Sequence, residues 1–433
     1  MKAFPTSAGS SLTRREFLKT SSLAAVAGTL PVQDAAAQEA TSRAGTLRVG
    51  LIGCGGRGTG AAAQALAADS NVKLVALGDA FNDRLQGSLA TLKKQHEVAG
   101  KIEVPEDRCF VGFDAYQKVI EHSDVVLLAT PPHFRPRHLE AAIAAGKHVF
   151  AEKPVAVDAP GVRKVLAVCE EARKKNLSIV SGLAMRYSNG HREIIKRIHD
   201  GAIGEIRALQ ANDYRGPIWV KPRQPDWTDM HWQMRNWYYF TWLSGDFNVE
   251  QHVHSLDKLA WAMKDETPVS VSGTGGRQQR TDPKYGNIYD HFNVVYEYAN
   301  GVKGFASCRH FLKSDNNVSD HIFGSKGTCH ISSDKTSIEG AKKWRYDGPD
   351  SDMYQNEHNE LFASIRAGKP INNGHYMSMS SMLAIAGRMS AYTGKTLTWD
   401  ECFNSRQDLT PPKYDWSAIE VPQVAIPGFT PFV

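Results

Sequence analysis

Long apolar runs are absent from this sequence of 433 residues. A helix that crosses a bilayer needs about 18 to 20 consecutive apolar residues, and no stretch of the chain approaches that length. The sequence therefore predicts no membrane span. With 42% hydrophobic and 22% charged residues, the composition is typical of a globular chain long enough to form two or three domains.

Closely spaced cysteines are also absent. The six cysteines never stand in a C-x-x-C pair, which argues against a zinc ribbon and against a redox motif. We interpret them as mostly buried thiols. They are Cys54, Cys109, Cys169, Cys308, Cys329 and Cys402.

Basic tracts are missing as well. The net charge of +5 includes four cations and two anions within the first 37 residues, which supply +2 and leave +3 for the remainder. A nucleic-acid surface needs clustered lysine and arginine, so the charge distribution predicts no nucleic-acid partner.

The N-terminus carries a pattern typical of an export signal. Arg14 and Arg15 in "SLTRREFLK" precede a weakly apolar stretch, "TSSLAAVAGTL", and a small-residue cleavage site that ends at Ala37. This order predicts a twin-arginine signal over residues 1–37, a linker over 38–45, and a periplasmic or secreted protein that uses the twin-arginine export machinery. A disordered basic tail is the alternative.

A nucleotide-binding pattern follows from residue 46. In "TLRVGLIGCGGRGTGAAAQAL" the residues Gly53, Gly55 and Gly58 occupy the G-x-G-x-x-G positions between a buried strand and a helix. Those glycines permit a tight turn, backbone approach to a pyrophosphate, and close packing of helix on strand. Asp79 ends the next strand, 21 positions after Gly58, where a carboxylate binds the ribose hydroxyls of NAD and disfavours NADP. The alternative is that Asp79 only caps the next helix. Because Arg84 is nearby, NADP remains a possible cofactor.

The following segments continue the alternation of strand and helix. "SDVVLLATPP" is a buried apolar run that stops at two prolines, and "HLEAAIAAGKHVFAEKP" predicts a helix, a glycine stop and another short strand. The pattern predicts an α/β fold with a doubly wound parallel sheet over residues 46–160, and ligands at the carboxyl ends of its strands.

Four stretches together resemble the glucose–fructose oxidoreductase/inositol dehydrogenase (Gfo/Idh/MocA) family. They are "VGLIGCGGRG", "LLATPPHFRPRHLEAAIAAGKHVFAEKP", "MRYSNGHREIIKRIHDGAIGEI" and "SGDFNVEQHVHSLD", in the family's order. The resemblance implies an N-terminal Rossmann domain and, over residues 161–403, a C-terminal α/β domain with an open, largely antiparallel sheet. That sheet would bind substrate on one side and pair subunits on the other, giving a homo-oligomer (dimer or tetramer). Residues 404–433 are predicted to form an irregular tail.

The resemblance also implies site residues. The family lysine of the Glu-Lys-Pro motif falls on Lys153 and would reach both the nicotinamide ribose and the substrate hydroxyl, with a surface lysine as the alternative. The predicted cofactor contacts are Gly53, Gly55, Gly56, Arg57, Gly58, Asp79, Thr130, Pro131, His133, Glu152 and Lys153.

The family's second motif falls on Glu250, His254 and Asp257. On one helix these spacings share a face, so His254 is predicted as the general base, with Glu250 orienting the imidazole or binding a hydroxyl. We predict no metal, although a divalent ion held by Glu250 and a histidine, and a purely structural helix face, are alternatives. Many family members have aspartate in place of Glu250 and glycine in place of His252, which leaves the substrate open.

An aromatic stretch, "WTDMHWQMRNWYYFTW", holds seven aromatic residues in sixteen positions. Such rings stack on sugars, or they form core or a subunit interface. The predicted substrate contacts are Arg186, Tyr187, Arg235, Trp237, Glu250 and Asp257, with a structural ion pair or hydrogen bond as the alternative for the first two.

The sequence thus predicts an exported NAD-dependent oxidoreductase that acts on a sugar, cyclitol or glycoside hydroxyl. Because free NAD is scarce outside the cytoplasm, the cofactor is predicted to be tightly bound. An NAD-requiring glycosidase that works by transient oxidation and elimination is the alternative, and a sugar-binding protein without chemistry is a third possibility.

Overall fold

A computed structural model describes residues 45–332, 335–349 and 351–433. The predicted twin-arginine signal, and the linker apart from Gly45, lie outside the described residues. Among the described residues, no helix is both long and apolar enough to cross a membrane.

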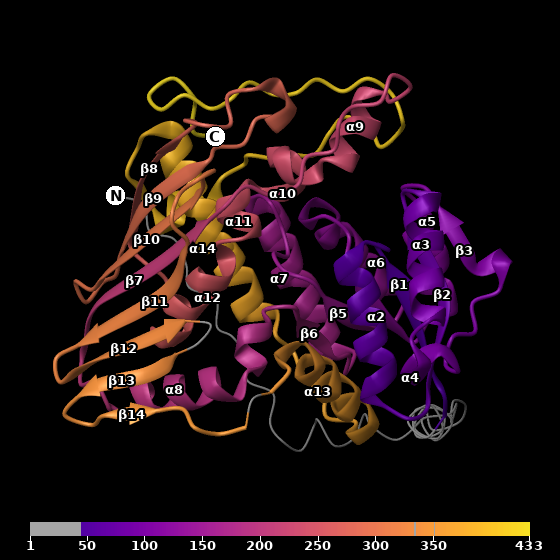
Figure 1. Ribbon diagram of the computed structural model, residues 1–433, viewed down its shortest axis with the longest axis horizontal. Coiled ribbons are helices and arrows are strands. Elements are labelled where there is room, and N and C mark those ends of the chain that lie inside the picture. The colour runs from indigo at the N-terminus through magenta and orange to yellow at the C-terminus, as the bar shows by residue number, and fades with distance from the viewer. Residues whose placement is uncertain (1–44, 333–334, 350) are drawn as a thin grey trace, which may run out of the picture. The chain divides into compact units, whose positions relative to one another are not determined.

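The first sheet has six parallel strands in the order β3-β2-β1-β4-β5-β6, which confirms the predicted doubly wound arrangement (Figure 1). Buried residues lie on both faces of its central strands because helices cover both sides. The strands are β1 (Leu47–Ile52), β2 (Val72–Asp79), β3 (Cys109–Val111), β4 (Val125–Leu128), β5 (His148–Ala151) and β6 (Ile179–Ser181). The helices are α2 (Gly56–Ala68), α3 (Asn82–Lys93), α4 (His96–Ala99), α5 (Ala115–His122), α6 (Arg135–Ala144) and α7 (Ala159–Lys174).

This sheet extends past the predicted domain boundary at residue 160. Strand β6 pairs with β5 in parallel, so the sheet continues to Ser181. The apolar run before Arg186 is recognisable as a strand in the sequence, but its pairing partner is not. The assignment of β6 to the second domain was therefore wrong.

Among the described residues, the second sheet has nine strands and is largely antiparallel as predicted, with β7 and β10 as its one parallel pair. In sheet order the strands are β14 (Trp344–Arg345), β13 (Thr336–Gly340), β12 (Gly327–Ser332), β11 (Asn317–Gly324), β7 (Ile206–Arg215), β10 (Lys303–His310), β9 (His291–Glu297), β8 (Ser270–Gly276) and β15 (Leu397–Thr398).

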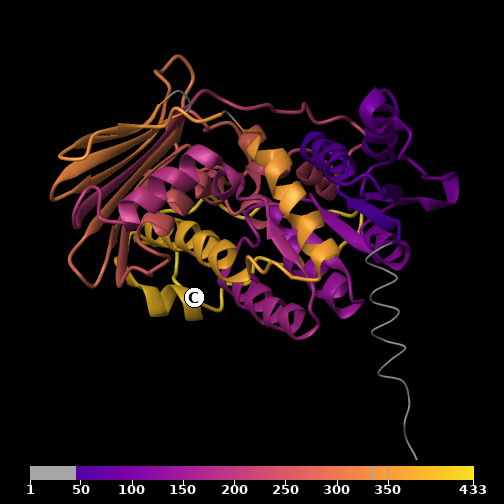
Figure 2. The same ribbon diagram turned by 90° about the horizontal axis from the view of Figure 1, so that it is seen from below.

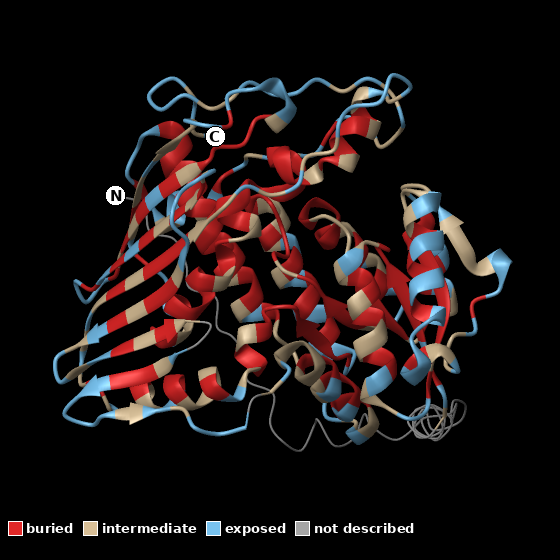
Figure 3. Cartoon of the chain, in the orientation of Figure 1, coloured by how far each residue is buried: buried red, intermediate tan, exposed pale blue. Residues whose placement is uncertain are grey.

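One face of this sheet is covered by helices and the other is open. Burial alternates along β9 and β10, as expected for a sheet that packs on one side only (Figure 3). Helix α14 (Gly374–Thr393) contacts β8 and β9, and α12 (Val253–Ala262) contacts β7 and β11. The remaining helices here are α8 (Asn189–His199), α9 (Asp229–Arg235), α10 (Thr241–Ser244), α11 (Phe247–Glu250) and α15 (Trp399–Asn404).

Helix α13 (Met353–Ala367) returns to the first sheet. It packs on α2, beside which it lies in orange in Figure 2, and it also contacts β6. The helix ends at Gly368, which adopts a left-handed conformation with φ 61°. The segment next to the glycine-rich turn therefore comes from the far end of the chain.

The C-terminal tail, residues 405–433, forms no helix or strand. It runs out to α9 and returns, in yellow along the upper edge of Figure 1. Met230 N–H donates to Ser417 O at 3.2 Å near the turning point, and Arg406 N–H donates to Val433 O at 3.2 Å where the tail closes on itself. The tail therefore runs beside elements that surround both sheets.

Candidate active site

A cavity of about 780 Å³ lies at the carboxyl ends of β1, β2, β4 and β5, where ligands of doubly wound sheets are expected. Its opposite wall comes from the segment after β7 and from α9, α11 and α12. Of the predicted site residues, the cavity brings together Gly53, Gly55, Gly56, Arg57, Gly58, Asp79, Thr130, Pro131, Glu152, Lys153, Arg235, Trp237, Glu250 and His254.

The glycine-rich turn leaves open space for a ligand. Gly53 has φ 98°, and a Cβ on Gly58 would lie 1.9 Å from Gly53 O, so neither position tolerates a side chain. Gly55 and Gly56 have nothing within 4 Å of a Cβ, and both line the cavity. Helix α2 starts here without an acidic residue in its first turn. Its free N–H groups and this cradle fit the diphosphate of a dinucleotide.

Asp79 supports the turn from the end of β2. Its Oδ2 accepts from Cys54 N–H at 2.6 Å, and its Oδ1 accepts from Phe81 N–H at 2.8 Å. Burial raises the pKa of this carboxyl. Each carboxylate oxygen has a second lone pair, so Asp79 can both shape the turn and accept the ribose hydroxyls of NAD.

Lys153 and Glu250 form an ion pair across the cavity. Lys153 Nζ donates to Glu250 Oε1 at 2.9 Å and to Glu250 O at 2.5 Å. The two side chains are each 13% exposed. This pair fixes the ammonium group at the edge of the cavity, where it can donate to a substrate oxygen.

The predicted meeting of Glu250, His254 and Asp257 on one helix face is wrong. Helix α11 ends at Glu250, and α12 begins at Val253. At the break, His252 N–H donates to Phe247 O. Because the helix is interrupted, Glu250 turns to Lys153 rather than to the imidazole.

His254 lines the cavity as a neutral imidazole. Burial, together with the charges of Lys153, Lys258 and Arg215, lowers its pKa well below the usual 6.5. Its Nδ1 is buried and has no hydrogen-bond partner among the described residues. An unprotonated imidazole in a cavity wall is suited to accept a proton from an alcohol.

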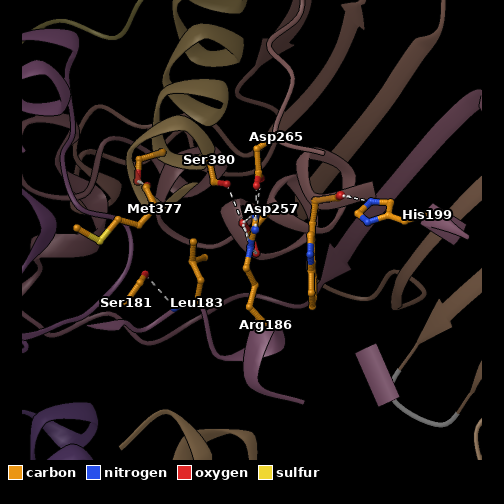
Figure 4. A network of polar contacts seen from close by, with 10 residues as sticks. Ser181, Leu183, Arg186, His199, Asp257, Asp265, Met377 and Ser380 are labelled. Carbon is orange, nitrogen blue, oxygen red and sulfur yellow. Dashed lines mark hydrogen bonds and ion pairs between the residues drawn. The ribbon is translucent and has the colours of Figure 1, made fainter. Parts of the chain in front are cut away.

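Arg186, Tyr187 and Asp257 are predicted substrate contacts, but they do not line the cavity. Figure 4 shows Arg186 between Asp257 and Asp265, with Nε donating to Asp257 at 3.0 and 3.2 Å. Ser380 Oγ also donates to Asp257 at 2.8 Å. Tyr187 OH donates to Asn373 at 2.7 Å. Buried charges need partners, and these residues supply them to one another.

His133, a predicted cofactor contact, is also absent from the cavity wall. Its Nε2 lies 2.7 Å from Tyr414 OH, and its ring packs at 5.1 Å from Trp242. Burial lowers its pKa to about 4. The residue is a neutral link between the nucleotide-binding sheet and the C-terminal tail.

The aromatic stretch mostly forms core, and only part of it faces the cavity. Trp232, Tyr239 and Phe240 are buried, whereas Trp237 lines the cavity. Arg235 lines it too, but its guanidinium donates to both oxygens of Asp83, at 2.7 and 2.8 Å. The Arg235 guanidinium is therefore part of the cavity wall, and the two N–H groups that bind Asp83 are not free for a substrate.

Several cavity residues were missed in the sequence. Phe81 and Phe113 follow strand ends, and Trp219 lies in the irregular segment after β7. Arg135 follows the Thr-Pro-Pro stretch after β4, and its position next to a strand end was the available signal. No cluster of three or more His, Cys, Asp or Glu suited to a metal occurs within residues 45–332, 335–349 and 351–433.

Comparisons with known proteins agree with this geometry. Inositol 2-dehydrogenase of Rhizobium meliloti is 25% identical over 321 residues, which cover 71% of this chain and 86% of that protein. The 2,7-anhydro-N-acetylneuraminate hydratase of Escherichia coli is 29% identical over 41% of this chain and 43% of its own length. The aldose-aldose oxidoreductase of Caulobacter crescentus shares the fold, with a TM-score of 0.65, 20% identity, and coverage of 82% and 99% of the two chains.

Two family models match in order. The one described as "Oxidoreductase family, NAD-binding Rossmann fold" matches residues 47–180, and the "GFO/IDH/MocA C-terminal domain" matches residues 191–330. The first match ends within β6, in agreement with the extended first sheet. Since the two matches together span more than half of the sequence, the chain belongs to the GFO/IDH/MocA oxidoreductase family.

Proposed function

We propose that the protein oxidises a hydroxyl group of a sugar, cyclitol or glycoside with NAD as the hydride acceptor. The observation that carries this proposal is the placement of Lys153 and neutral His254 in the same cavity as the glycine-rich turn. The relatives support the substrate class, because one is named an inositol dehydrogenase and one similar structure is a levoglucosan dehydrogenase in complex with NADH and levoglucosan.

The residues divide the chemistry of alcohol oxidation among them. A bound nicotinamide would accept the hydride from the carbon that bears the hydroxyl. His254 takes the hydroxyl proton, and Lys153 donates a hydrogen bond to the same oxygen. Glu250 holds the ammonium of Lys153 in place. Trp237 offers a flat apolar face to a sugar ring.

The test begins with protein purified without added nucleotide. The released NAD(H) and NADP(H) are quantified after denaturation, and the intact protein is assayed on a panel of sugars, cyclitols and glycosides. Bound NAD that is reduced by a substrate supports the proposal. Release of an aglycone without net reduction indicates the glycosidase alternative. A chain that neither contains nor binds nucleotide contradicts both and indicates a binding protein.

The walls of the cavity support tight retention of the cofactor. Trp416, in the C-terminal tail, packs at 5.1 Å from Phe81 and at 4.7 Å from Phe113, which both line the cavity. Arg235 stacks on Phe81 at 3.7 Å while it pairs with Asp83. Contacts from two distant segments therefore hold the cavity residues Phe81 and Phe113 in place, and we expect these contacts to slow nucleotide release.

We expect Trp416→Ala to release NAD about tenfold faster than the unaltered protein, since aromatic pairs contribute about 0.5–1.5 kcal/mol each. Dissociation is followed by rapid gel filtration or by quenching of NADH fluorescence. Phe429→Ala is the matched control, because Phe429 lies in the same tail but is 86% exposed. Equal dissociation rates for all three proteins would show that the tail does not retain the cofactor.

Export through the twin-arginine route is part of the same proposal and rests on the sequence of residues 1–37. We expect the full chain to reach the periplasm or the medium, and the double substitution of Arg14 and Arg15 by lysine to retain it in the cytoplasm. Cell fractionation with an antibody against the mature chain measures this. Unchanged distribution of the lysine variant would contradict the proposed route.

Subunit pairing through the open face of the second sheet also remains a proposal. Phe305 on β10 and Phe323 on β11 lie on this face and are 45% and 37% exposed. They align with Gln210 and Ala208 on the intervening strand β7, two positions apart, so they point to the same side. We expect a dimer or tetramer by light scattering and a smaller assembly for Phe305→Asp; a monomeric unaltered chain would contradict pairing.

A further inference from the structure

Arg135 is a buried cation in the cavity wall, and its guanidinium forms no ion pair with the residues that the structure describes. It is the first residue of α6, lines the cavity and is 4% exposed. Its Nε and Nη1 atoms are buried and make no hydrogen bond within the described residues. Other cations of the cavity are committed to carboxylates, in the pairs Lys153–Glu250, Arg57–Glu152 and Arg235–Asp83.

Arg135 lines the same cavity as Lys153, Glu250 and His254. Burial lowers its pKa to about 10, against the opposing influence of the Glu152 and Glu250 carboxylates, so it stays charged at neutral pH. Glu250 is the residue bound to Lys153. The first turn of α6 contains no acidic residue, and the positive end of its dipole adds to the field.

A buried cation of this kind is suited to bind an anionic ligand group. A guanidinium without hydrogen bonds does not recover the free energy of its desolvation. The nearby Glu152 and Glu250 carboxylates favour its charged form, but each is already paired with another cation. The diphosphate of a dinucleotide already has its own cradle at Gly55, Gly56 and the start of α2. Arg84 and Lys221 also line the cavity, but both are only partly buried. The remaining source of an anion near Lys153 and His254 is the substrate.

We propose that Arg135 binds a carboxylate of the substrate, and hence that the protein oxidises a hydroxyl of a sugar acid. This inference rests on the proposed function. The redox step is unchanged: the carbon–hydrogen bond supplies the hydride for NAD, the hydroxyl proton goes to His254, and a ketone forms. The carboxylate is not consumed. It orients the ring by the two-pronged hydrogen bonding that guanidinium offers to carboxylate.

The experiment compares matched acids and neutral sugars. The pairs are glucuronate with glucose and galacturonate with galactose, assayed as kcat/KM for NAD reduction with the unaltered protein, Arg135→Met, Arg135→Lys and Arg137→Met. Arg137 is the control, because it lies on the same helix outside the cavity and is half exposed. We expect at least one acid to exceed its neutral partner by on the order of 100-fold, as a charge-assisted contact allows.

The variants separate the sources of the anion. Arg135→Met should lose that preference, with kcat/KM falling far more for the acid than for its neutral partner, and Arg135→Lys should retain part of it. Equal activity on both members of each pair in the unaltered protein overturns the inference but not the proposed function. If Arg135→Met weakens both members equally and releases NAD faster, Arg135 binds the cofactor diphosphate, which also overturns it.

A binding measurement keeps the inference testable without turnover. The NADH-bound protein is titrated with each acid and neutral partner, and its melting temperature is recorded. We expect a rise with an acid in the unaltered protein and in Arg137→Met, but not in Arg135→Met with an otherwise native melting curve. If no sugar reduces NAD but the acid still raises the melting temperature, the proposed function fails while the carboxylate site stands. No rise with any acid overturns the site.

Discussion

Replacing His254 by asparagine is expected to lower kcat/KM for hydroxyl oxidation by about 10²- to 10⁴-fold, the usual contribution of a positioned general base. The imidazole lines the cavity in its neutral form and would take the hydroxyl proton directly. Asparagine keeps a similar size but cannot accept that proton at neutral pH. NAD binding should change little, because the nucleotide turn lies on a different wall. The measurement is steady-state NAD reduction, with bound NAD quantified in parallel.

The pH profile gives this prediction a second readout. A base must be unprotonated, so activity is lost as pH falls through the pKa of His254 in the folded protein. Because burial and neighbouring cations lower that pKa well below 6.5, activity should persist at pH 6.5 and fall only in more acidic solution. His254→Asn should lack this acidic limb, whereas the exposed control His375→Asn should keep it. An acidic limb centred at or above pH 6.5 would argue against His254 as the base.

Replacing Arg186 by methionine is expected to destabilise the fold by about 3–5 kcal/mol, because it leaves a buried carboxylate without its counter-charge. Asp257 is 1% exposed, and its main partner is the guanidinium of Arg186. Asp265 binds the same guanidinium from the other side (Figure 4). The free energy of unfolding is measured in urea at a fixed NAD concentration. KM for substrate and the affinity for NAD should stay unchanged in the folded fraction.

A surface pair supplies the control for Arg186. Lys196 and Asp200 are joined by a hydrogen bond of 2.6 Å, and their side chains are 70% and 61% exposed. Exposed pairs contribute little to the free energy of unfolding, so Lys196→Met should be nearly neutral. If Arg186→Met instead raised KM at unchanged stability, Arg186 would be a substrate contact after all, and the ion-pair interpretation would be wrong.

The features that the sequence predicted correctly are local ones. The glycine-rich turn requires Gly53 and Gly58 because their backbone and close contacts leave no room for a side chain. The same holds for the alternating strands and helices of the first sheet. In each case a few neighbouring residues set the backbone conformation, so spacing and residue type suffice.

The ion-pair partners of charged side chains could not be predicted from local spacing. The spacing of Glu250 and His254 suggested contact on one helix face, but a break between α11 and α12 redirected Glu250 to Lys153. Arg186 appeared suited to substrate and instead lies between two aspartates. A buried charge needs a partner of opposite charge. Which partner is close enough depends on how distant segments of the chain pack.

By itself the sequence determined the two-sheet α/β class and the dinucleotide turn. It also singled out Lys153 and His254 as the candidates for the hydrogen-bond donor and the general base. Only the tertiary structure decided that Trp416, more than 300 positions after Phe81 and Phe113, packs on these two cavity residues. It also placed Arg135 in the cavity wall, with its Nε and Nη1 atoms buried and without hydrogen bonds among the described residues. The physical reason is the range of the interactions. Backbone turns and hydrophobic periodicity act over a few residues, whereas burial and charge pairing are set by segments that meet only in the folded chain.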